Sequence, residues 1–435
     1  MTRLTAPGFP AGPIRARART GPAGAFPALA EYGSAVFGAL PPDGDDVLDR
    51  ARLAPPIFTP QRLDKLIELG REPTYADVDL TTVIGGIPAR SPVYVSALGS
   101  TEVAGSGPGL SVIRQAARLG VPLVIGENVA STSGYRDTGG AAGLLLRIKT
   151  YLAELDGEHG GIVVQQSTED ADSEVWNLVY SDPVVGELLA SGRLAFELKA
   201  GQGAKPGLGG MTVLDAAEAA RLAGRYLLDA VAGAESAESV DAVDAGGGGG
   251  GGGGGAVGRD VASLRSGSPG TFTEEILRRQ VHLMRNNYPR ARVWVKLPPV
   301  RDVRAAAFTA WSAGADSVTV DGGEGGTGWA PLSFLQHVGL PLAECLRRIG
   351  PPPACLLVSG RIWEGARAVK CLALGATAVG LGRAALLAAD EEPEHGLVNL
   401  VECLALELRM LVSALGKYAP GRLGAEDVWF PEGDS

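Results

Sequence analysis

The chain has 435 residues and is poor in several residue types, and each shortage excludes a class of protein. Its four cysteines show neither CxxC spacing nor the density of a disulfide-stabilised fold, which predicts a reducing compartment, the cytoplasm. Acidic residues outnumber basic ones by 49 to 39, so no surplus of positive charge is available for a nucleic acid. No apolar run approaches the ~20 residues of a membrane helix, and no apolar segment follows the N-terminal arginines as in a signal peptide.

Histidine is also scarce, and its placement excludes further classes. The four histidines have no metal-ligand spacing, so we expect no metal site. The sequence contains no GxSxG segment and no evident Cys/His pair, so no motif indicates a covalent nucleophile. Tyr135 and Glu324 could reach a site, but we interpret both as ordinary loop surface.

The composition divides the chain into an arm and one domain. Residues 1–45 are rich in Arg, Pro, Gly and Ala, which predicts a flexible N-terminal arm. The chain as a whole is 45% hydrophobic and 20% charged, as a globular protein is. Because α/β barrels often run long as single domains, we expect residues 46–435 to form one domain.

Short β-branched runs alternate with Ala- and Leu-rich stretches from residue 92 onward, the pattern of parallel βα units. The expected strands are Val93–Ala97, Pro122–Ile125, Ile162–Gln165, Ala195–Lys199, Val293–Leu297, Ser317–Asp321, Cys355–Ser359 and Ala378–Gly382. Eight strands are what a closed α/β barrel of the (β/α)8 (TIM) type needs. An open doubly wound sheet is the alternative, but no GxGxxG opens a first helix within a compact βαβ unit.

One long insertion, about residues 211–262, interrupts the alternation after the fourth strand. We expect it to hold an amphipathic helix at about Val213–Val231, followed by ten consecutive glycines, Gly246–Gly255. Polyglycine has maximal backbone entropy and no side chain to bury, which predicts a flexible tether. Because this loop lies at the carboxyl-terminal mouth of the barrel, the insertion is either a lid or a passive spacer.

Glycine and arginine follow the last two strands, as Ser359-Gly360-Arg361 and Gly382-Arg383. Glycine lets backbone N–H groups approach an anion closely, and the following helix N-terminus adds a positive dipole. One such loop alone would indicate only a tight turn. Two of them, each with an arginine, favour a phosphate site.

Lysine is rare, with seven in the chain, and three lysines follow the fourth and fifth strands: Lys199, Lys205 and Lys296. Because arginine fills most other basic positions, we infer that a compact ammonium group is required there. Lys296 lies within the apolar run Val293–Leu297, which argues against a lysine at the surface with its ammonium group in water. For Lys205 both interpretations stand.

Five segments match motifs of one known family. Gln202–Gly210 resembles the segment QGAKPGxGG, Asp321–Pro331 the loop GxxGGTGASPL, and Gln336–Pro341 the segment KHAGLP. Val295–Leu297 is similar to a VKL strand, and Gly126–Glu127 to a TGEGG turn. The family is the FMN domain of glutamate synthases, and the likeness runs over about residues 52–435 in the family's order.

The resemblance implies a barrel that holds the FMN phosphate at strands seven and eight and the isoalloxazine ring over the mouth. Lys296 would touch the ring and stabilise the negative charge that builds near N1 on reduction. Glu127, Lys199 and Lys205 would line the substrate pocket as catalytic residues. The residues assigned to FMN are Ser96, Ala97, Gln165, Lys296, Gly325, Gly326, Thr327, Ser359, Gly360, Arg361, Gly382 and Arg383.

The chain also departs from the family. Members with a [3Fe–4S] cluster carry three closely spaced cysteines soon after strand eight, whereas here only Cys403 follows that strand. The family's PPPHHD stretch is replaced by Leu264–Gly270, and the TGEGG turn is reduced to Gly126-Glu127-Asn128. The flavin-binding half is therefore retained and the glutamate-forming half altered, which argues against glutamate synthase activity itself.

Three functions remain open. The first is an FMN-dependent oxidoreductase that transfers hydride between flavin N5 and a small substrate bearing a carboxylate or amine. The second is the FMN subunit of a multi-protein transferase similar to N-methylglutamate synthase, with glutaminase and electron-donor chains as partners. The third is a non-catalytic barrel that serves as a scaffold. A homo-oligomer is compatible with each of them.

Overall fold

The computed structural model describes residues 3–31, 35, 44–98, 107–126, 143–168, 173–201, 206–209, 211–214, 220, 227–231, 262–266, 270–327 and 330–431. Eight parallel strands form a closed barrel in the order β11-β12-β13-β14-β4-β5-β6-β7. The strands are β4 (Val93–Leu98), β5 (Leu123–Ile125), β6 (Ile162–Ser167), β7 (Leu194–Lys199), β11 (Arg292–Leu297), β12 (Ser317–Asp321), β13 (Leu356–Ser359) and β14 (Ala378–Leu381). The predicted (β/α)8 barrel is confirmed, with strand ends shifted by two residues at most.

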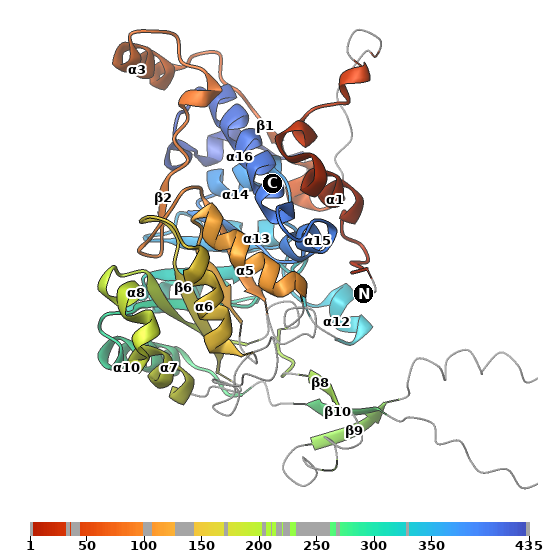
Figure 1. The fold of residues 1–435 in the computed structure, drawn as a ribbon, viewed down its shortest axis with the longest axis vertical. Helices are drawn as coiled ribbons and strands as arrows, with labels where there is room; N and C mark the ends of the chain where they lie inside the picture. Colours follow the sequence, from red (N-terminus) through yellow and green to blue (C-terminus); the bar gives the residue numbers. More distant parts are fainter. Residues whose placement is uncertain are drawn as a thin grey trace, which may run out of the picture.

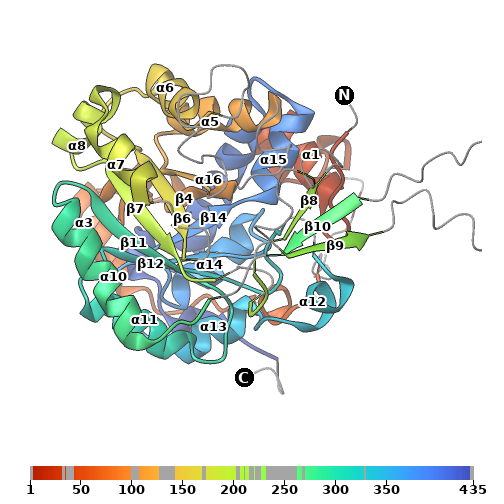
Figure 2. The same cartoon turned by 90° about the horizontal axis from the view of Figure 1, so that it is seen from below.

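Helices surround these strands (Figure 2). They are α5 (Gly107–Leu119), α6 (Leu144–Glu154), α7 (Ser173–Ser181), α8 (Gly186–Ala190), α10 (Glu274–Asn287), α11 (Val303–Ser312), α12 (Leu332–His337), α13 (Leu342–Ile349), α14 (Gly365–Ala373), α15 (Arg383–Glu391) and α16 (Gly396–Ala414). In α16, for example, Leu397, Leu400, Leu404 and Leu408 recur at helical spacing and are fully buried. No helix among the described residues is both long and apolar enough to cross a membrane.

The barrel interior is apolar at one end and polar at the other. A hairpin of β2 (Thr82–Ile84) and β3 (Ile87–Ala89) closes the amino-terminal end, where the Trp294 indole donates to the Gly85 carbonyl at 3.0 Å. The apolar layer there contains Ile84, Ile87, Ala89, Tyr94, Val124, Val163, Ala195, Trp294, Leu357 and Ala378. Two residues further along the strands, with the same inward parity, polar side chains replace apolar ones. The carboxyl-terminal end of the barrel is therefore the polar end.

The N-terminal segment contradicts the expected flexible arm. Helix α1 (Ala11–Thr20) packs against α15 and α16 (Figure 1), with Ile14 fully buried. Arg15 pairs with Asp390 at 2.6 Å, and Arg17 pairs with Glu407 at 2.5 Å. The prediction was wrong for this helix because the acidic partners of its arginines lie more than 370 positions away in the sequence.

The insertion also differs from the prediction. In place of a helix at Val213–Val231, strands β8 (Met211–Leu214) and β9 (Leu227–Val231) both pair antiparallel with β10 (Ala262–Ser266). This small sheet lies at the lower right of Figure 1. The helical prediction was wrong at both of its ends, because pairing with β10 supplies the backbone hydrogen bonds that the local apolar spacing could not reveal. The glycines Gly246–Gly255 lie outside the described residues.

Three shorter elements complete the described chain. Helix α2 (Val47–Arg50) lies against α13 and α14. Helix α3 (Pro60–Leu69) follows it and buries none of its residues in this chain. Strand β1 (Arg52–Leu53) pairs with β15 (Val428–Trp429), which joins the two ends of the domain.

Candidate functional site

Lys296 lies at the end of β11 with 6% of its surface exposed. Its ammonium group forms an ion pair with Asp321 Oδ2 at 2.9 Å. The other carboxylate oxygen of Asp321 accepts a hydrogen bond from the Ser359 hydroxyl. Three adjacent strands thus join one cation, one anion and one hydroxyl at the polar end of the barrel.

A second carboxyl, that of Glu197, lies one layer deeper on β7 and is 1% exposed. It accepts hydrogen bonds from Gln165 Nε2 at 2.5 Å and from the Thr319 hydroxyl at 2.8 Å. Burial raises the pKa of Glu197, although Lys296 and both hydrogen bonds act in the opposite direction. Burial also raises the pKa of Tyr94 on β4, with Asp321 and Glu197 adding to that effect.

Sequence reasoning assigned no role to Glu197, Thr319 or Asp321. A signal for Glu197 was present, since it is a lone acid within the apolar strand Leu194–Leu198 and shares the inward parity of Lys199. The signal for Asp321 was its place at a strand end, next to the strand of Lys296.

The expected lysine cluster is brought together in part. Lys199 and Lys296 are paired in register on adjacent strands β7 and β11. Lys199 is half-buried. Lys205 and Glu127 lie outside the described residues. Two of the three predicted lysines therefore share one edge of the barrel mouth.

The loop after β13 has an unusual backbone. Gly360 has a φ of 143°, and an added Cβ atom would lie 3.2 Å from the Gly322 backbone nitrogen, so glycine is required. Arg361 has a φ of 56°, a left-handed conformation that costs a non-glycine residue about 1–2 kcal/mol. Its guanidinium donates to Asp49 Oδ2 at 3.1 Å and to the Gly8 carbonyl at 2.9 Å. These contacts hold the strained residue in place.

The loop after β14 places a second arginine nearby. Arg383 begins α15, donates to the Glu324 carbonyl at 2.6 Å and stacks on the Phe9 ring with its guanidinium 4.2 Å from the ring centroid. Burial lowers the pKa of Arg383, and the charge of Arg361 lowers it further. Two guanidinium groups whose charges repel one another, with Arg383 at the N-terminus of α15, fit an anion such as phosphate.

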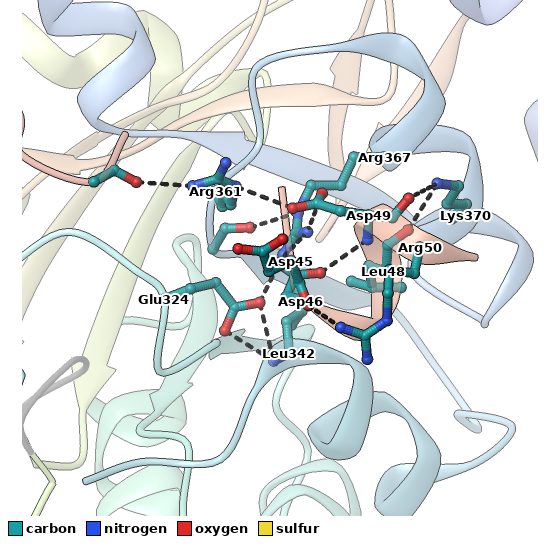
Figure 3. Close-up of polar contacts among 12 residues, drawn as sticks. Asp45, Asp46, Leu48, Asp49, Arg50, Glu324, Leu342, Arg361, Arg367 and Lys370 are labelled. Atoms are coloured by element: carbon teal, nitrogen blue, oxygen red, sulfur yellow. Dashed lines mark hydrogen bonds and ion pairs between the residues drawn. The ribbon is translucent and has the colours of Figure 1, made fainter. Parts of the chain in front are cut away.

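Glu324 is not the loop surface residue that we expected, and Figure 3 shows its surroundings. Its carboxylate accepts from the Leu342 backbone N–H at 3.1 Å and pairs with Arg367 at 2.6 Å. Burial raises the pKa of Glu324, while Arg367 opposes that shift. The prediction was wrong because the partners of Glu324 come from α13 and α14, which the sequence places well beyond its loop.

Arg367 is the centre of this buried network. Its side chain is fully buried, and besides Glu324 it pairs with Asp46 at 2.6 Å and with Asp49 at 2.8 Å (Figure 3). Lys370, one turn further along α14, donates to the Leu48 carbonyl at 2.7 Å. The network therefore ties the loop after β12 to α2 and α14, directly behind Arg361.

The other residues assigned to the cofactor lie around these groups. Ser96 and Gln165 are buried at the polar end of the barrel, and Ala97 is half-buried beside them on β4. Gly325, Gly326 and Thr327 follow β12, and a Cβ atom on Gly326 would lie 3.0 Å from the Arg383 side chain. Gly382 leads into α15 and has open space where a Cβ atom would stand.

An open pocket of about 490 Å³ lies beside the loops after β7 and β11, within the usual range for small-molecule sites. Its lining residues are Pro206, Gly207, Pro299, Val300, Arg301, Asp302, His337, Gly339 and Leu340. This lining combines apolar groups with a guanidinium, a carboxylate and an imidazole, which would suit a small, polar molecule.

Part of the chain is similar to known glutamate synthase sequences. Residues 244–392 match the family model described as the conserved region in glutamate synthase. The archaeal-type glutamate synthase [NADPH] of Thermotoga maritima is 32% identical over 203 residues, which cover 44% of this chain and 34% of that protein. The glutamate synthase large subunit-like protein of Rhizobium meliloti is 31% identical over 214 residues, 46% of this chain and 41% of that protein. The chain thus spans well under half the length of these curated relatives.

Comparison with solved structures gives the same barrel. A soluble mutant of (S)-mandelate dehydrogenase from Pseudomonas putida has a TM-score of 0.52 and 17% identity, covering 98% of this chain and 100% of that one. A flavocytochrome b2 mutant with pyruvate bound has a TM-score of 0.52 and 16% identity, covering 88% and 77%. At such identities the likeness concerns the fold alone. In its barrel, in the motifs at its strand ends and in the matched conserved region, this chain is similar to the glutamate-synthase-like barrel proteins.

Proposed function

We propose that this chain binds FMN across the polar end of its barrel and acts as an oxidoreductase on a small substrate. The observation that carries the proposal is the placement of two different sites on one barrel edge. An arginine-flanked glycine cradle lies at β13 and β14, and a buried lysine with hydrogen-bonding neighbours lies at β11. FMN has a phosphate, which the glycine cradle would bind, and a flat polar ring, which the buried lysine and its neighbours would bind.

The phosphate would be held by Gly360, Arg361, Gly382 and Arg383, with Ser359, Gly325, Gly326 and Thr327 beside them. Gly382 leads into helix α15, whose N-terminus favours negative charge. The buried Glu324–Arg367 pair would hold the loop after β12 in place beside the phosphate. One anion between Arg361 and Arg383 would relieve the repulsion between their positive charges.

The ring would be held by Ser96, Ala97, Gln165 and Lys296. A carboxamide, a hydroxyl and an ammonium supply both donors and an acceptor for the ring edge. Bound FMN would supply hydride transfer at its N5 atom, and the protein would supply position and charge.

The substrate would be a small molecule with a carboxylate or an amine, oriented by Lys199, Lys205 and Glu127. Support comes from the register pairing of Lys199 with Lys296, and from the pocket between the loops after β7 and β11. Cationic side chains would attract the carboxylate and fix its distance from the flavin.

A second candidate is the FMN subunit of a multi-protein, glutamate-synthase-like complex. It is favoured by the large subunit-like name of the Rhizobium relative and by the fraction of each relative that this chain spans. Partner chains would then supply ammonia or electrons. A non-catalytic scaffold is disfavoured, because a buried ion pair such as Lys296–Asp321 stabilises a fold less than apolar packing would.

One purification tests the proposal. The protein should be yellow and should release FMN on heating, identified by chromatography against FMN, FAD and riboflavin. Anaerobic mixing with candidate amino, hydroxy and keto acids should bleach the flavin for one class. Oxidation coupled to added electron-transfer proteins would favour the second candidate. A colourless protein that takes up no FMN on titration would contradict both.

A further inference from the structure

Among the described residues, the floor of the proposed flavin site holds two buried carboxyl groups and one buried ammonium group. Lys296, Asp321 and Glu197 are 6%, 7% and 1% exposed, respectively. A buried charge without a partner costs several kcal/mol, so we expect the positive and negative charges of these three side chains to cancel. The 2.9 Å ion pair between Lys296 and Asp321 already matches the one cation with one anion.

Among the described residues, Glu197 therefore shares the buried cation Lys296 with Asp321. On β11 it faces Lys296, on β12 Thr319 and Asp321, and on β6 Gln165. Tyr94 on β4 is a further titratable neighbour with a neutral hydroxyl, and Lys199, two residues along β7, is half-buried. If all the acids were ionised, the cluster would carry one uncompensated negative charge in the barrel interior.

We propose that Asp321 and Glu197 are positioning residues for Lys296: Asp321 fixes and neutralises its ammonium group, and Glu197 lies beneath the pair as a neutral carboxylic acid. The part that concerns the flavin rests on the proposed function. The part that concerns the charges of the three side chains does not.

The hydrogen bonds around Glu197 accommodate this proton. The Thr319 hydroxyl can either donate or accept, so it can receive the acid proton at its present distance of 2.8 Å. A flip of the Gln165 amide would exchange its nitrogen and oxygen and offer a second acceptor. Burial raises the pKa of Glu197, in agreement with the neutral form.

The consequence is that the flavin would meet an ion pair rather than a bare cation. Asp321→Asn should leave Lys296 unmatched and favour the reduced, more negative flavin. Lys296→Met should leave Asp321 unmatched and disfavour it. The double variant should restore the balance and return close to the wild-type value.

Redox titration of the FMN-loaded protein tests this order. We expect the ratio of reduced to oxidised flavin at a fixed potential to rise about tenfold in Asp321→Asn, which is about 30 mV for a two-electron couple. We expect a similar fall in Lys296→Met and less than a threefold change in the double variant. Asp427→Asn removes the acid of another buried pair, Lys417–Asp427 at 2.6 Å, and should leave the ratio unchanged.

Two results would overturn the role of Asp321. In the first, Asp321→Asn has the wild-type potential. In the second, the double variant matches Lys296→Met, as it would if Lys296 acted as an isolated cation.

Infrared spectroscopy tests the charge of Glu197 without any flavin. The apoprotein at neutral pH should show a carboxylic acid carbonyl band that Glu197→Gln removes and ¹³C-glutamate labelling shifts. Glu364→Gln is the matched control, because burial also raises the pKa of Glu364, outside the barrel interior, and its loss should leave the Glu197 band in place. A spectrum in which Glu197→Gln removes no acid band would overturn the neutral state.

The apoprotein also separates this inference from the proposed function. If no FMN binds, the proposed function fails, yet unfolding by urea still tests the ion pair. Lys296→Met and Asp321→Asn should each lower the unfolding midpoint, and the double variant should recover most of the loss. Additive losses in the double variant would show that the two charges do not depend on one another.

Discussion

The guanidinium of Arg383 lies 4.2 Å from the centroid of the Phe9 ring, so the N-terminal segment contacts the loop that follows the last barrel strand. The preceding residue, Gly8, accepts a hydrogen bond from Arg361 through its carbonyl. Both arginines of the proposed phosphate site are thus held by residues that precede α1. The N-terminal segment is part of the site's structure.

Removing the Phe9 ring should weaken FMN binding. A cation–π contact with a buried arginine contributes about 1–2 kcal/mol, so Phe9→Leu should raise the Kd for FMN roughly five- to thirtyfold. Fluorescence titration of the apoprotein measures this change. Phe26→Leu is the control, because Phe26 is 57% exposed. Equal affinities for the two variants would contradict the contribution of Phe9.

The arginines should distinguish FMN from riboflavin. Each charge-assisted hydrogen bond to a phosphate contributes about 1.5–3 kcal/mol, so Arg383→Gln should weaken FMN binding roughly 10- to 150-fold and leave riboflavin binding unchanged. Arg279→Gln, which alters a 78% exposed arginine on α10, should change neither. An equal loss for both ligands would mean that Arg383 acts through the fold and not on the phosphate.

The buried network behind Arg361 should be important for stability. Arg367→Met leaves the carboxylates of Asp46, Asp49 and Glu324 without their shared cation, and we expect a loss of about 3–5 kcal/mol in the free energy of unfolding. Urea denaturation measures it. A loss below about 1 kcal/mol would show that the three acids find other partners or protons.

Acid should release helix α1. Burial opposes ionisation of Glu391, but hydrogen bonds from Arg3, Arg15 and Arg19 outweigh it and lower its pKa from 4.5 to about 2. The stabilisation is therefore complete above pH 4.5 and is lost as the pH falls through about 2. Pepsin cleavage within residues 1–20 should increase over that range. In Glu391→Gln it should already be fast at pH 4.5, and a wild-type cleavage profile in that variant would contradict the docking by Glu391.

The thiols should be unreactive in the native protein. Burial raises the pKa of Cys345 and Cys371 to about 12 and that of Cys403 to about 11. Ellman's reagent at pH 8 should therefore label these three only after denaturation. Rapid modification of the native protein would indicate local opening of the helices that carry them.

The sequence was sufficient for the barrel because each strand is a local pattern. The run Val293–Leu297 is short and mostly apolar with two valines whatever its neighbours are, and six of the other seven strands also hold a β-branched residue. It was insufficient where partners are distant. Arg15 is buried where Asp390 and Glu391 lie opposite it, and β8 and β9 form by pairing with β10. Local periodicity in the sequence reveals neither the distant partners of Arg15 nor the pairing with β10.

The candidate site divides in the same way. Lys296, Gly360 and Arg383 could be identified because they end strands, and strand ends meet at one barrel edge. Asp321 and Glu197 received no role, because their effect on Lys296 depends on the closure that brings β7, β11 and β12 side by side. The charges of these three side chains depend on one another across three strands, and no single sequence motif contains all three.

The cofactor content of the purified, folded chain decides whether this barrel holds FMN. We expect one FMN per chain, either already bound or taken up on titration of the apoprotein, and weaker binding in Arg383→Gln. FAD as the main bound species would contradict it, as would a folded chain that binds no flavin at all.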